Sequence, residues 1–181
     1  MGVDQRDLEA SSDEELLVLI VDGSGEALRE LYQRHVGWLV LRLMRRCSDR
    51  EVVDEVVQDT FMGVWRNAAG FRGEGPVAAW IWGIGIRRLV ERFRRRPVPT
   101  RAWDTSGVQS SSAEEMVLLG VEHGDLGPAI DGLAPELRAV LRATVLDGLT
   151  TREAAVLLGI PQGTVKSRMR RARRELREAL A

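Results

Sequence analysis

The chain has 181 residues, of which 44% are hydrophobic and 29% charged, and its formal net charge is only −1. These values suit one domain of ordinary size or two small ones, and no apolar run approaches the roughly 20 residues that a membrane-spanning helix needs. One cysteine and two distant histidines exclude an internal disulfide and a thiolate zinc cluster, and the acidic N-terminus lacks the layout of a secretory signal. We therefore expect a cytoplasmic protein without membrane insertion, cofactor or structural metal.

Positive and negative charges lie in separate blocks along the chain. Residues 1–30 contain nine acidic residues and two arginines, whereas residues 87–96 contain six arginines and one glutamate. Residues 102–137 contain seven acidic residues and no lysine or arginine, and residues 166–177 contain seven basic residues and one acid. A solvated helix face would explain any one block, but alternating blocks favour separate surfaces for different partners, with the basic ones suited to a polyanion.

Helix is the only regular structure that the first part of the sequence supports. Ser12 and Glu15 have the spacing of a capping box before the apolar run LLVLIV. Apolar residues at helical spacing then predict a helix over 26–47. Another helix is predicted over 50–67, capped by Asp49 or by the serine before it.

The middle of the chain is predicted to contain a loop, a helix and a linker. Residues 68–76, AAGFRGEGP, form the glycine-rich loop, and the following helix covers 77–96 and stops at the sequence PVP. Segment 97–112, PVPTRAWDTSGVQSSS, combines prolines, serines and glycine without periodicity, which is typical of a flexible linker. Helical pattern then returns and continues to the end. The sequence thus predicts an all-α protein in which the linker joins two small helical domains, 1–96 and 113–181.

The C-terminal residues predict a helix-turn-helix. In the last helix, one stripe is apolar and the opposite side is basic; the apolar stripe consists of Val165, Met169, Ala172 and Leu176. The preceding TTREAAVLLGIPQG predicts a short helix that ends at Gly159 before a tight turn, with Ala155 small enough to let two helices approach closely. In this layout the second helix enters the DNA major groove. Its basic side chains would set affinity and salt dependence through phosphates, and a few near the helix start would read base edges.

Two parts of the chain resemble bacterial sigma factors. DEVVQDTFMGVW and the later FRGEGPVAAWIWGIGIRRLVERFRRR resemble sigma region 2, and GLAPELRAVLRATVLDGLTTREAAVLLGIPQGTVKSRMRRARREL resembles region 4. Both regions, a short linker and nothing like region 3 between them resemble the extracytoplasmic-function (ECF) group. The resemblance covers residues 12–96 and 113–180. It implies an alternative sigma factor that binds core RNA polymerase and directs promoter-specific initiation through the −10 and −35 elements.

The resemblance assigns two roles to the first domain. The 50–67 helix would dock on the coiled coil of the polymerase β′ subunit through four polar residues, Asp54, Glu55, Gln58 and Asp59. Loop 71–76 and the helix after it would capture the unpaired non-template strand of the −10 element, with candidate contacts at Arg72, Trp80, Arg87, Arg88, Arg92, Arg94 and Arg95. A structural role is the alternative for Trp80.

The helix that follows the loop departs from the family pattern. Gly85-Ile86-Arg87 stands where the family commonly has Ala-Arg-Asn, and the asparagine helps to read the melted strand, so the usual base preference is not expected to carry over. Gly83 and Gly85 each weaken a helix by about 1 kcal/mol relative to alanine. We expect this segment to be loosely ordered until DNA or polymerase binds.

In the second domain, the resemblance assigns −35 contacts to the start of the last helix. The candidates are Lys166, Ser167, Arg168, Arg170 and Arg171, with Arg173, Arg174 and Arg152 nearer the phosphates. The 135–147 helix resembles the part that meets the flap of the β subunit, although its apolar residues Leu137, Val140, Leu141 and Val145 can equally be domain core. An anti-sigma factor is a further expected partner, and the protein would be nucleoid-associated within the holoenzyme.

Two other classes of function are the alternatives to this resemblance. An enzyme is not expected, because the sequence has no phosphate-binding loop, no nucleophile elbow and no histidine beside a catalytic partner. A stand-alone helix-turn-helix transcriptional regulator is the stronger alternative. Such a regulator would need a sensory or receiver domain, generally with strands, whereas residues 1–96 have a helical pattern throughout.

Overall fold

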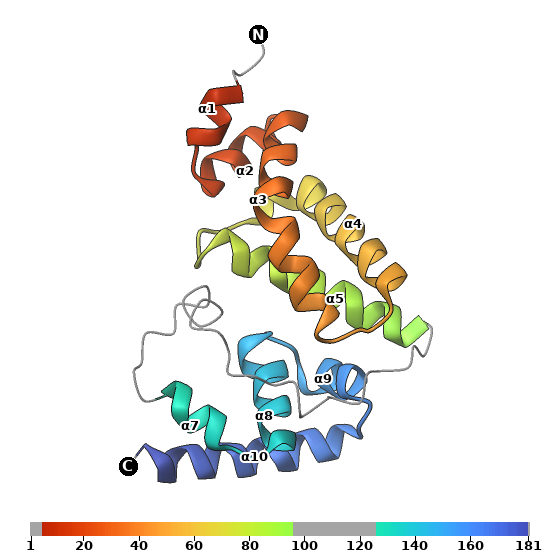
Figure 1. Cartoon of the computed structure of the whole chain (residues 1–181), viewed down its shortest axis with the longest axis vertical. Coiled ribbons are helices and arrows are strands. Elements are labelled where there is room, and N and C mark those ends of the chain that lie inside the picture. Colours follow the sequence, from red (N-terminus) through yellow and green to blue (C-terminus); the bar gives the residue numbers. More distant parts are fainter. Residues whose placement is uncertain (1–4, 96–125, 181) are drawn as a thin grey trace. The chain divides into compact units, whose positions relative to one another are not determined.

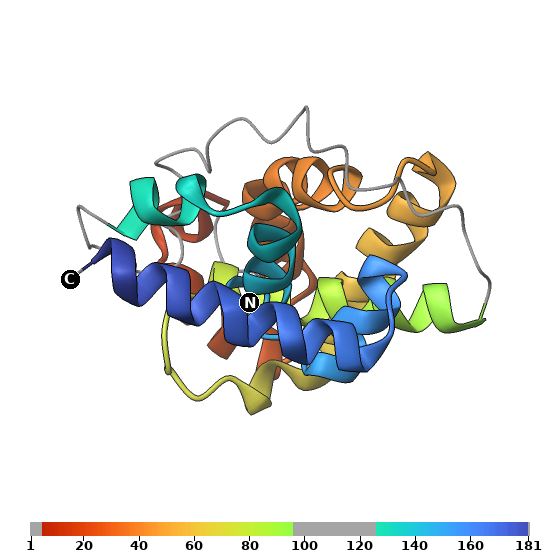
Figure 2. The same cartoon turned by 90° about the horizontal axis from the view of Figure 1, so that it is seen from below.

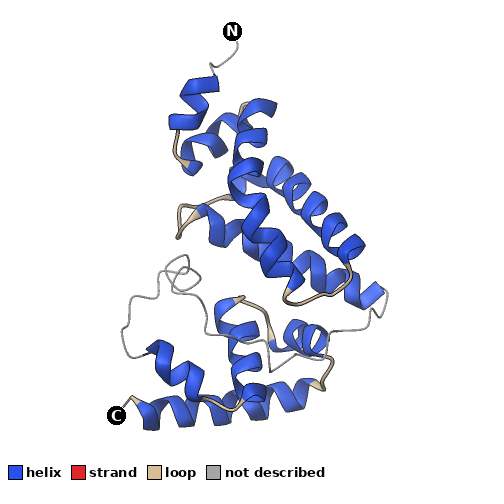
Figure 3. Cartoon of the chain, viewed as in Figure 1, coloured by secondary structure: helices blue, strands red, loops and turns tan. Residues whose placement is uncertain are grey.

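The computed structural model describes residues 5–95 and 126–180, and every regular element in those ranges is a helix (Figures 1 and 3). Because these ranges contain no strand, the all-α prediction is confirmed. The chain forms two compact units, Met1–Leu89 and Val90–Ala181, and the boundary between them falls within a helix. The predicted linker, 97–112, and the start of the predicted second domain lie outside the described residues.

The first unit contains helices of which three start directly after a capping side chain. The helices are α1 (Gln5–Ala10), α2 (Asp13–Val21), α3 (Gly25–Met44), α4 (Arg50–Asn67) and α5 (Val77–Arg95), which runs past the boundary at Leu89, with the 3₁₀ turn η1 (Ala68–Gly70) after α4. Ser12 and Glu15 form the predicted capping box at α2. Ser24 and Asp49 each accept a hydrogen bond from the third backbone N–H of the following helix, so α3 and α4 begin directly after them.

The core of this unit lies where α3, α4 and α5 meet. The buried faces agree with the sequence prediction, since none of the following is more than 5% exposed: Val53, Val57, Phe61 and Val64 of α4, and Trp82, Ile86 and Leu89 of α5. Gly85 of α5 is also buried, and a Cβ there would lie 3.2 Å from Leu39 Cδ1 and 3.3 Å from Thr60 Oγ1. Gly85, expected only to weaken its helix, therefore lets the continuous helix α5 pack closely against α3 and α4.

Arg34 of α3 fastens the first two helices to the third. Its guanidinium donates to the carbonyl oxygens that end α1, those of Leu8 (2.9 Å), Glu9 (3.0 Å) and Ser11 (2.8 Å). It also pairs with Glu30 at 2.7 Å and with Asp13 at 3.2 Å. Orphan carbonyls at a helix end need such donors, and a charged donor makes stronger bonds than a neutral one. One side chain thus holds the α1–α2 corner against α3.

His35, the next residue, makes a second attachment to α2. Trp38 Nε1 donates to His35 Nδ1 at 2.9 Å, and His35 Nε2 lies 2.7 Å from Asp13 Oδ2. Because an indole N–H can only donate, Nδ1 is the acceptor and the proton on Nε2 donates to the carboxylate. The hydrogen bonds of this histidine are thus directed inside the fold, which favours a structural role.

A tryptophan in contact with two arginines joins α5 to α3. Trp82 is 1% exposed, and the guanidinium carbons of Arg42 and Arg46 lie 4.2 and 4.6 Å from its ring centroid. Arg46 also donates to the Arg42 carbonyl oxygen at 3.0 Å. Cation–π contacts gain strength when desolvated, so this cluster fixes the rotation of α5 about its own axis.

The second unit contains the predicted helix-turn-helix. Its described elements are α7 (Leu126–Gly132), α8 (Pro135–Leu141), the π-helical turn η2 (Arg142–Leu146), α9 (Thr151–Leu158) and α10 (Gln162–Ala179). The predicted 135–147 helix is thus α8 followed by η2. Helix α10 packs against both α8 and α9 (Figure 2).

Local signals end α9 where the sequence predicts. Thr150 and Glu153 form a capping box, and Gly159 adopts φ 63°, a left-handed conformation that favours glycine. The buried face of α9 is formed by Ala154 and Leu157, and Ala155, the small residue at which a close helix approach is predicted, is half-buried.

Candidate nucleic-acid interface

Helix α10 buries its apolar stripe and exposes a basic face. Val165, Met169 and Ala172 are buried as predicted, and Leu176 is half-buried. Of the predicted −35 contacts on this helix, Arg168 is half-buried and the others are exposed: Lys166, Ser167, Arg170, Arg171, Arg173 and Arg174. The structure therefore brings these side chains together on one accessible helix.

Two of these arginines form ion pairs along the helix. Arg171 Nε lies 2.8 Å from Glu175 Oε1, and Arg174 Nε lies 4.0 Å from Glu178 Oε1. Exposed pairs of this kind contribute little to stability. The sequence prediction did not include these two acids, although both follow their arginines by four residues, the spacing at which helical side chains meet.

A side-chain bridge joins the starts of α9 and α10. Gln162 Nε2 donates to Thr151 Oγ1 at 2.9 Å, and Arg152, the remaining −35 candidate, is exposed beside Thr151 in the first turn of α9. Gln162 was missed by sequence reasoning, because its partner lies eleven residues away across a turn. The bridge holds the N-terminal ends of the two helices together; the α10 end carries the candidate base contacts, and the α9 end carries Arg152.

The −10 candidates lie on α5 and on the loop before it. Arg72, Arg87, Arg94 and Arg95 are exposed, and Arg88 and Arg92 are half-buried. Two glycines in the loop have left-handed backbone, Gly73 (φ 71°) and Gly75 (φ 106°), so the loop conformation depends on them.

Trp80 is placed by an aromatic contact at the base of this loop. It is half-buried, and its ring packs edge-on against Phe71, with the centroids 5.6 Å apart. This contact favours the structural alternative for Trp80, in which it anchors the loop on α5.

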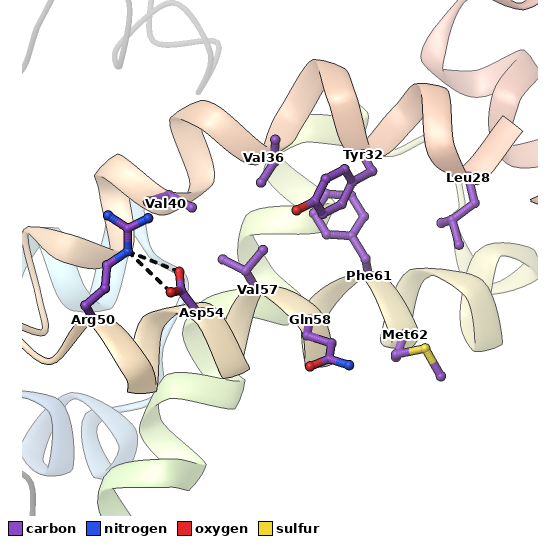
Figure 4. Close-up of a pocket in the computed structure, with 10 residues that line it drawn as sticks. All are labelled: Leu28, Tyr32, Val36, Val40, Arg50, Asp54, Val57, Gln58, Phe61 and Met62. Atoms are coloured by element: carbon purple, nitrogen blue, oxygen red, sulfur yellow. Dashed lines mark hydrogen bonds and ion pairs between the residues drawn. The ribbon is translucent and has the colours of Figure 1, made fainter. Parts of the chain in front are cut away.

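The polar candidates on α4 are all exposed. Asp54 and Gln58 line a groove between α3 and α4, whereas Glu55 and Asp59 are exposed elsewhere on the helix (Figure 4). The groove is lined mainly by apolar side chains: Leu28, Tyr32, Val36, Val40, Val57, Phe61 and Met62. Tyr32 meets Phe61 edge-on at 4.8 Å, and Arg50 Nε reaches both Asp54 carboxylate oxygens at 3.3 Å.

The α3 side of this groove was missed as a candidate site. Its residues fit the helical periodicity and served only to predict the helix, but Tyr32 is 41% exposed and Met62 across the groove is 42% exposed. On α8 and η2 the reverse holds: Leu137, Val140 and Leu141 are core, and Val145 is 55% exposed. Only Val145 of these four is thus available to a partner.

Within residues 5–95 and 126–180, no cluster of three or more histidine, cysteine or acidic side chains could hold a metal ion. In the same part of the chain, no helix is both long and apolar enough to span a bilayer. The surfaces that remain are basic helices and an apolar groove with polar edges.

Comparison with known proteins shows which family the chain belongs to. The family model for Sigma-70 region 2 matches residues 31–97, and that for Sigma-70, region 4, matches residues 124–176. The chain is 33% identical over 173 residues to the ECF RNA polymerase sigma factor SigM of Mycobacterium tuberculosis H37Rv, covering 93% of this chain and 85% of SigM. The chain belongs to the ECF RNA polymerase sigma factors.

Other sigma factors are similar over most of their length. The ECF RNA polymerase sigma factor RpoE of Cereibacter sphaeroides is 31% identical, over 86% of this chain and 87% of RpoE. Among solved structures, CnrH in complex with the cytosolic domain of CnrY is 26% identical, over 94% of this chain and 97% of CnrH, with a TM-score of 0.45. The sigma factor RpoE of Bartonella quintana, in complex with the anti-sigma factor NepR, is 23% identical over 84% of this chain and 95% of that chain, with a TM-score of 0.38.

Membership of the family connects the two matched regions with the surfaces described above. The region 2 match contains α4, α5 and the loop between them, and the region 4 match contains α8, α9 and most of α10. Sigma factors are initiation factors rather than enzymes, so an enzymatic role is excluded by the family.

Proposed function

We propose that the chain is an alternative sigma factor that binds core RNA polymerase and directs promoter-specific initiation through the −10 and −35 elements. The observation that carries this proposal is the presence of two arginine-bearing helices, α5 and α10, in separate sigma regions of one chain. Each helix buries an apolar face and exposes cationic side chains. A simple duplex-binding regulator has use for only one of them.

Helix α10 would enter the major groove of the −35 element. The first turns of a recognition helix reach base edges, so we assign base contacts to Lys166, Ser167, Arg168, Arg170 and Arg171. Arg173, Arg174 and Arg152 would contact phosphates, which position the protein without reading the sequence. The Gln162–Thr151 bridge would hold α9 and α10 at the angle that this docking requires.

Helix α5 and its loop would hold the unpaired non-template strand of the −10 element. A single strand is bound by cationic side chains that follow its backbone, a role suited to Arg72, Arg88, Arg92, Arg94 and Arg95. Base capture and phosphate contacts would offset the free energy of duplex opening, so the chain itself needs no nucleotide hydrolysis. Trp80 would act through Phe71 by fixing the base of the loop.

The α3–α4 groove and the exposed acids of α4 would face the polymerase. Asp54 and Gln58 at the groove, with Glu55 and Asp59 nearby on α4, would meet basic residues of the β′ coiled coil, while Tyr32 and Met62 offer apolar contact. Val145 would contact the β flap. An exposed apolar surface in the free protein also suits an anti-sigma factor, which would cover it until release.

The site of action follows from the partner. RNA polymerase and promoter DNA lie in the bacterial cytoplasm, and the chain in its holoenzyme would be associated with the nucleoid.

Reconstitution tests this function directly. Purified chain is mixed with core RNA polymerase, the complex is isolated by gel filtration, and transcripts from a pool of genomic fragments are mapped by sequencing their 5′ ends. We expect the chain to co-elute with core polymerase, and the mapped start sites to share −10 and −35 elements. Core polymerase alone, the control, should give no such start sites. Duplex binding by the chain without any added transcription would instead support a stand-alone regulator.

A pair of charge reversals tests the polymerase surface in the same assay. Asp59→Lys should weaken co-elution with core several-fold, because it places a cation where a basic partner is expected. Glu9→Lys, an equal charge change at an exposed position of α1, is the matched control and should behave as wild type. Equal co-elution of the two variants would contradict the assignment of Asp59.

A further inference from the structure

One face of α5 carries an unusual sequence of side chains outside the core. Trp82, Ile86 and Leu89 bury the inner face. Trp80, Gly83 and Arg87 follow one another at spacings of three and four residues, so they share the outer face. Arg87 is exposed and Gly83 is half-buried. The middle of this face is therefore bare backbone with one arginine beside it.

Arg87 lies over that bare backbone. Its Nη1 donates to the Gly83 carbonyl oxygen at 3.1 Å, and a Cβ added to Gly83 would lie 3.2 Å from the same Nη1. Apart from the two adjacent residues and the helix backbone, no other heavy atom lies within 4 Å of that added Cβ. Glycine at this position therefore provides the space in which the guanidinium rests.

The contact restricts an otherwise mobile side chain and leaves most of its donors available. An arginine carries roughly 2 kcal/mol of rotamer entropy, and its planar fork has five N–H donors, of which the Gly83 carbonyl takes one. Glu91, one helical turn further along, forms an ion pair with Arg95. Arg87 is thus held at the surface of α5 in a defined orientation.

We infer that Arg87, oriented by Gly83, determines base specificity within the −10 element by recognising a guanine of the unpaired non-template strand. A planar guanidinium pairs with guanine O6 and N7 through two parallel hydrogen bonds, whereas an asparagine side chain pairs with adenine N6 and N7. A base that has left the duplex exposes both edges to such a donor pair. This inference rests on the proposed function, in which α5 binds that strand.

Gly83 is the positioning residue in this arrangement. Replacing it with alanine would push the guanidinium away by a few tenths of an ångström, which the flexible end of Arg87 can accommodate. Alanine is also the better helix former. The substitution should therefore keep or raise stability while it impairs base recognition, and a purely structural role for Gly83 would not produce that combination.

The experiment uses holoenzyme assembled from the full chain and core RNA polymerase. The template is a promoter obtained by start-site mapping, with its −10 element randomised, and transcripts are counted by sequencing against the input pool. Wild type should enrich guanine at one position by roughly 5- to 150-fold, the range of a bidentate base contact. Arg87→Ala should abolish enrichment at that position and leave the other positions unchanged.

Two further variants separate charge, position and folding. Arg87→Lys keeps the charge but lacks the planar fork, so it should lose most of the guanine enrichment while retaining total transcription. Gly83→Ala should reduce the enrichment several-fold without lowering the unfolding midpoint in urea. Arg29→Ala removes an exposed arginine of α3 and serves as the unchanged control.

Each remaining outcome decides the matter. Transcription by wild type without guanine enrichment at any −10 position overturns the inference and leaves the sigma function standing. Enrichment that survives in both Arg87→Ala and Arg87→Lys overturns it as well. Absence of transcription from every template, including the parent promoter, would remove the sigma function itself and the inference with it.

Discussion

At the scale of single residues, Cys47 is a buried thiol that solvent cannot reach. It is 0% exposed, and its Sγ–H donates weakly to the Asp49 carbonyl oxygen at 3.6 Å. Burial raises the pKa of the Cys47 thiol, because a thiolate would lose its hydration there. A protonated, inaccessible thiol is a poor nucleophile, so the lone cysteine is not a redox sensor.

The raised pKa predicts how stability changes with pH. In the unfolded chain the thiol loses its proton above about pH 8.5, whereas the folded chain retains it. Above that pH the folded state holds more protons than the unfolded state, so the free energy of unfolding falls as pH rises, by at most about 1.4 kcal/mol per pH unit. Below it the thiol is neutral in both states and contributes no slope.

Urea unfolding at pH 7.5 and pH 9.5 measures this contribution when wild type is compared with Cys47→Ala. Other groups titrate equally in the two proteins, so their effects cancel in the difference. Wild type should lose more stability between the two pH values than the variant does. An equal loss in both would show that the thiol ionises in the folded protein as readily as in the unfolded one.

At the scale of elements, two glycines inside helices differ in how closely other side chains pack around them. Gly85 of α5 is buried, with Leu39 and Thr60 close to where its Cβ would be. Thr60 cannot easily move, because its hydroxyl donates to the Val56 carbonyl oxygen at 2.6 Å. Gly37 lies inside α3 and is exposed, with nothing within 4 Å of an added Cβ.

The contrast between these glycines predicts opposite effects of the same substitution. Gly85→Ala should lower the free energy of unfolding by about 1 kcal/mol, since overpacking outweighs the gain in helix propensity. Gly37→Ala should raise it by about 0.5–1 kcal/mol. Tryptophan fluorescence in urea reports mainly on unfolding of the first unit, which contains both glycines, because four of the five tryptophans precede residue 90. Stabilisation by both substitutions would mean that α5 does not pack closely at Gly85.

The starts and ends of some helices could be predicted from the sequence. Helix α4 covers the predicted residues, Arg50–Asn67. Its start could be predicted because the capping residue, Asp49, directly precedes it. Gly159 likewise predicts the end of α9, because glycine favours the left-handed conformation that ends this helix. These signals act over a few residues, so the sequence contains them in readable form.

Contacts between distant elements carry no such local signal. Arg34 binds carbonyl oxygens 23 to 26 residues earlier, and no periodicity indicates that partnership. Tyr32 fits the core pattern of α3 but lies at the edge of a groove, because α4 covers only part of that face. The contact between Arg87 and Gly83 spans four residues and was within reach of the sequence, yet glycine in a helix was interpreted only as a weakness.

At the scale of the whole molecule, a net charge of −1 conceals cations gathered on the surfaces that would bind DNA. Affinity for DNA depends on the number of phosphates neutralised at the interface, not on the net charge of the chain. Residues 166–177 alone contain seven basic residues and one acid, whereas most acids of the first unit lie in residues 1–30 and on α4. The holoenzyme should therefore bind promoter DNA with a strong dependence on salt.

Arg173 and Arg29 make the matched comparison for that expectation, since both are exposed arginines but only Arg173 lies on α10. Promoter affinity of the holoenzyme is measured between 50 and 200 mM salt, and the contribution of the core enzyme is common to every variant. Arg173→Ala should reduce the slope of log affinity against log salt by about 1 and weaken strong and weak promoters equally, because a phosphate contact carries no sequence information. Arg29→Ala should leave slope and affinity unchanged. If Arg173→Ala instead altered the ranking of −35 sequences, Arg173 would be reading bases, and the division of α10 into a base-reading start and a phosphate-binding continuation would have to move by at least one turn.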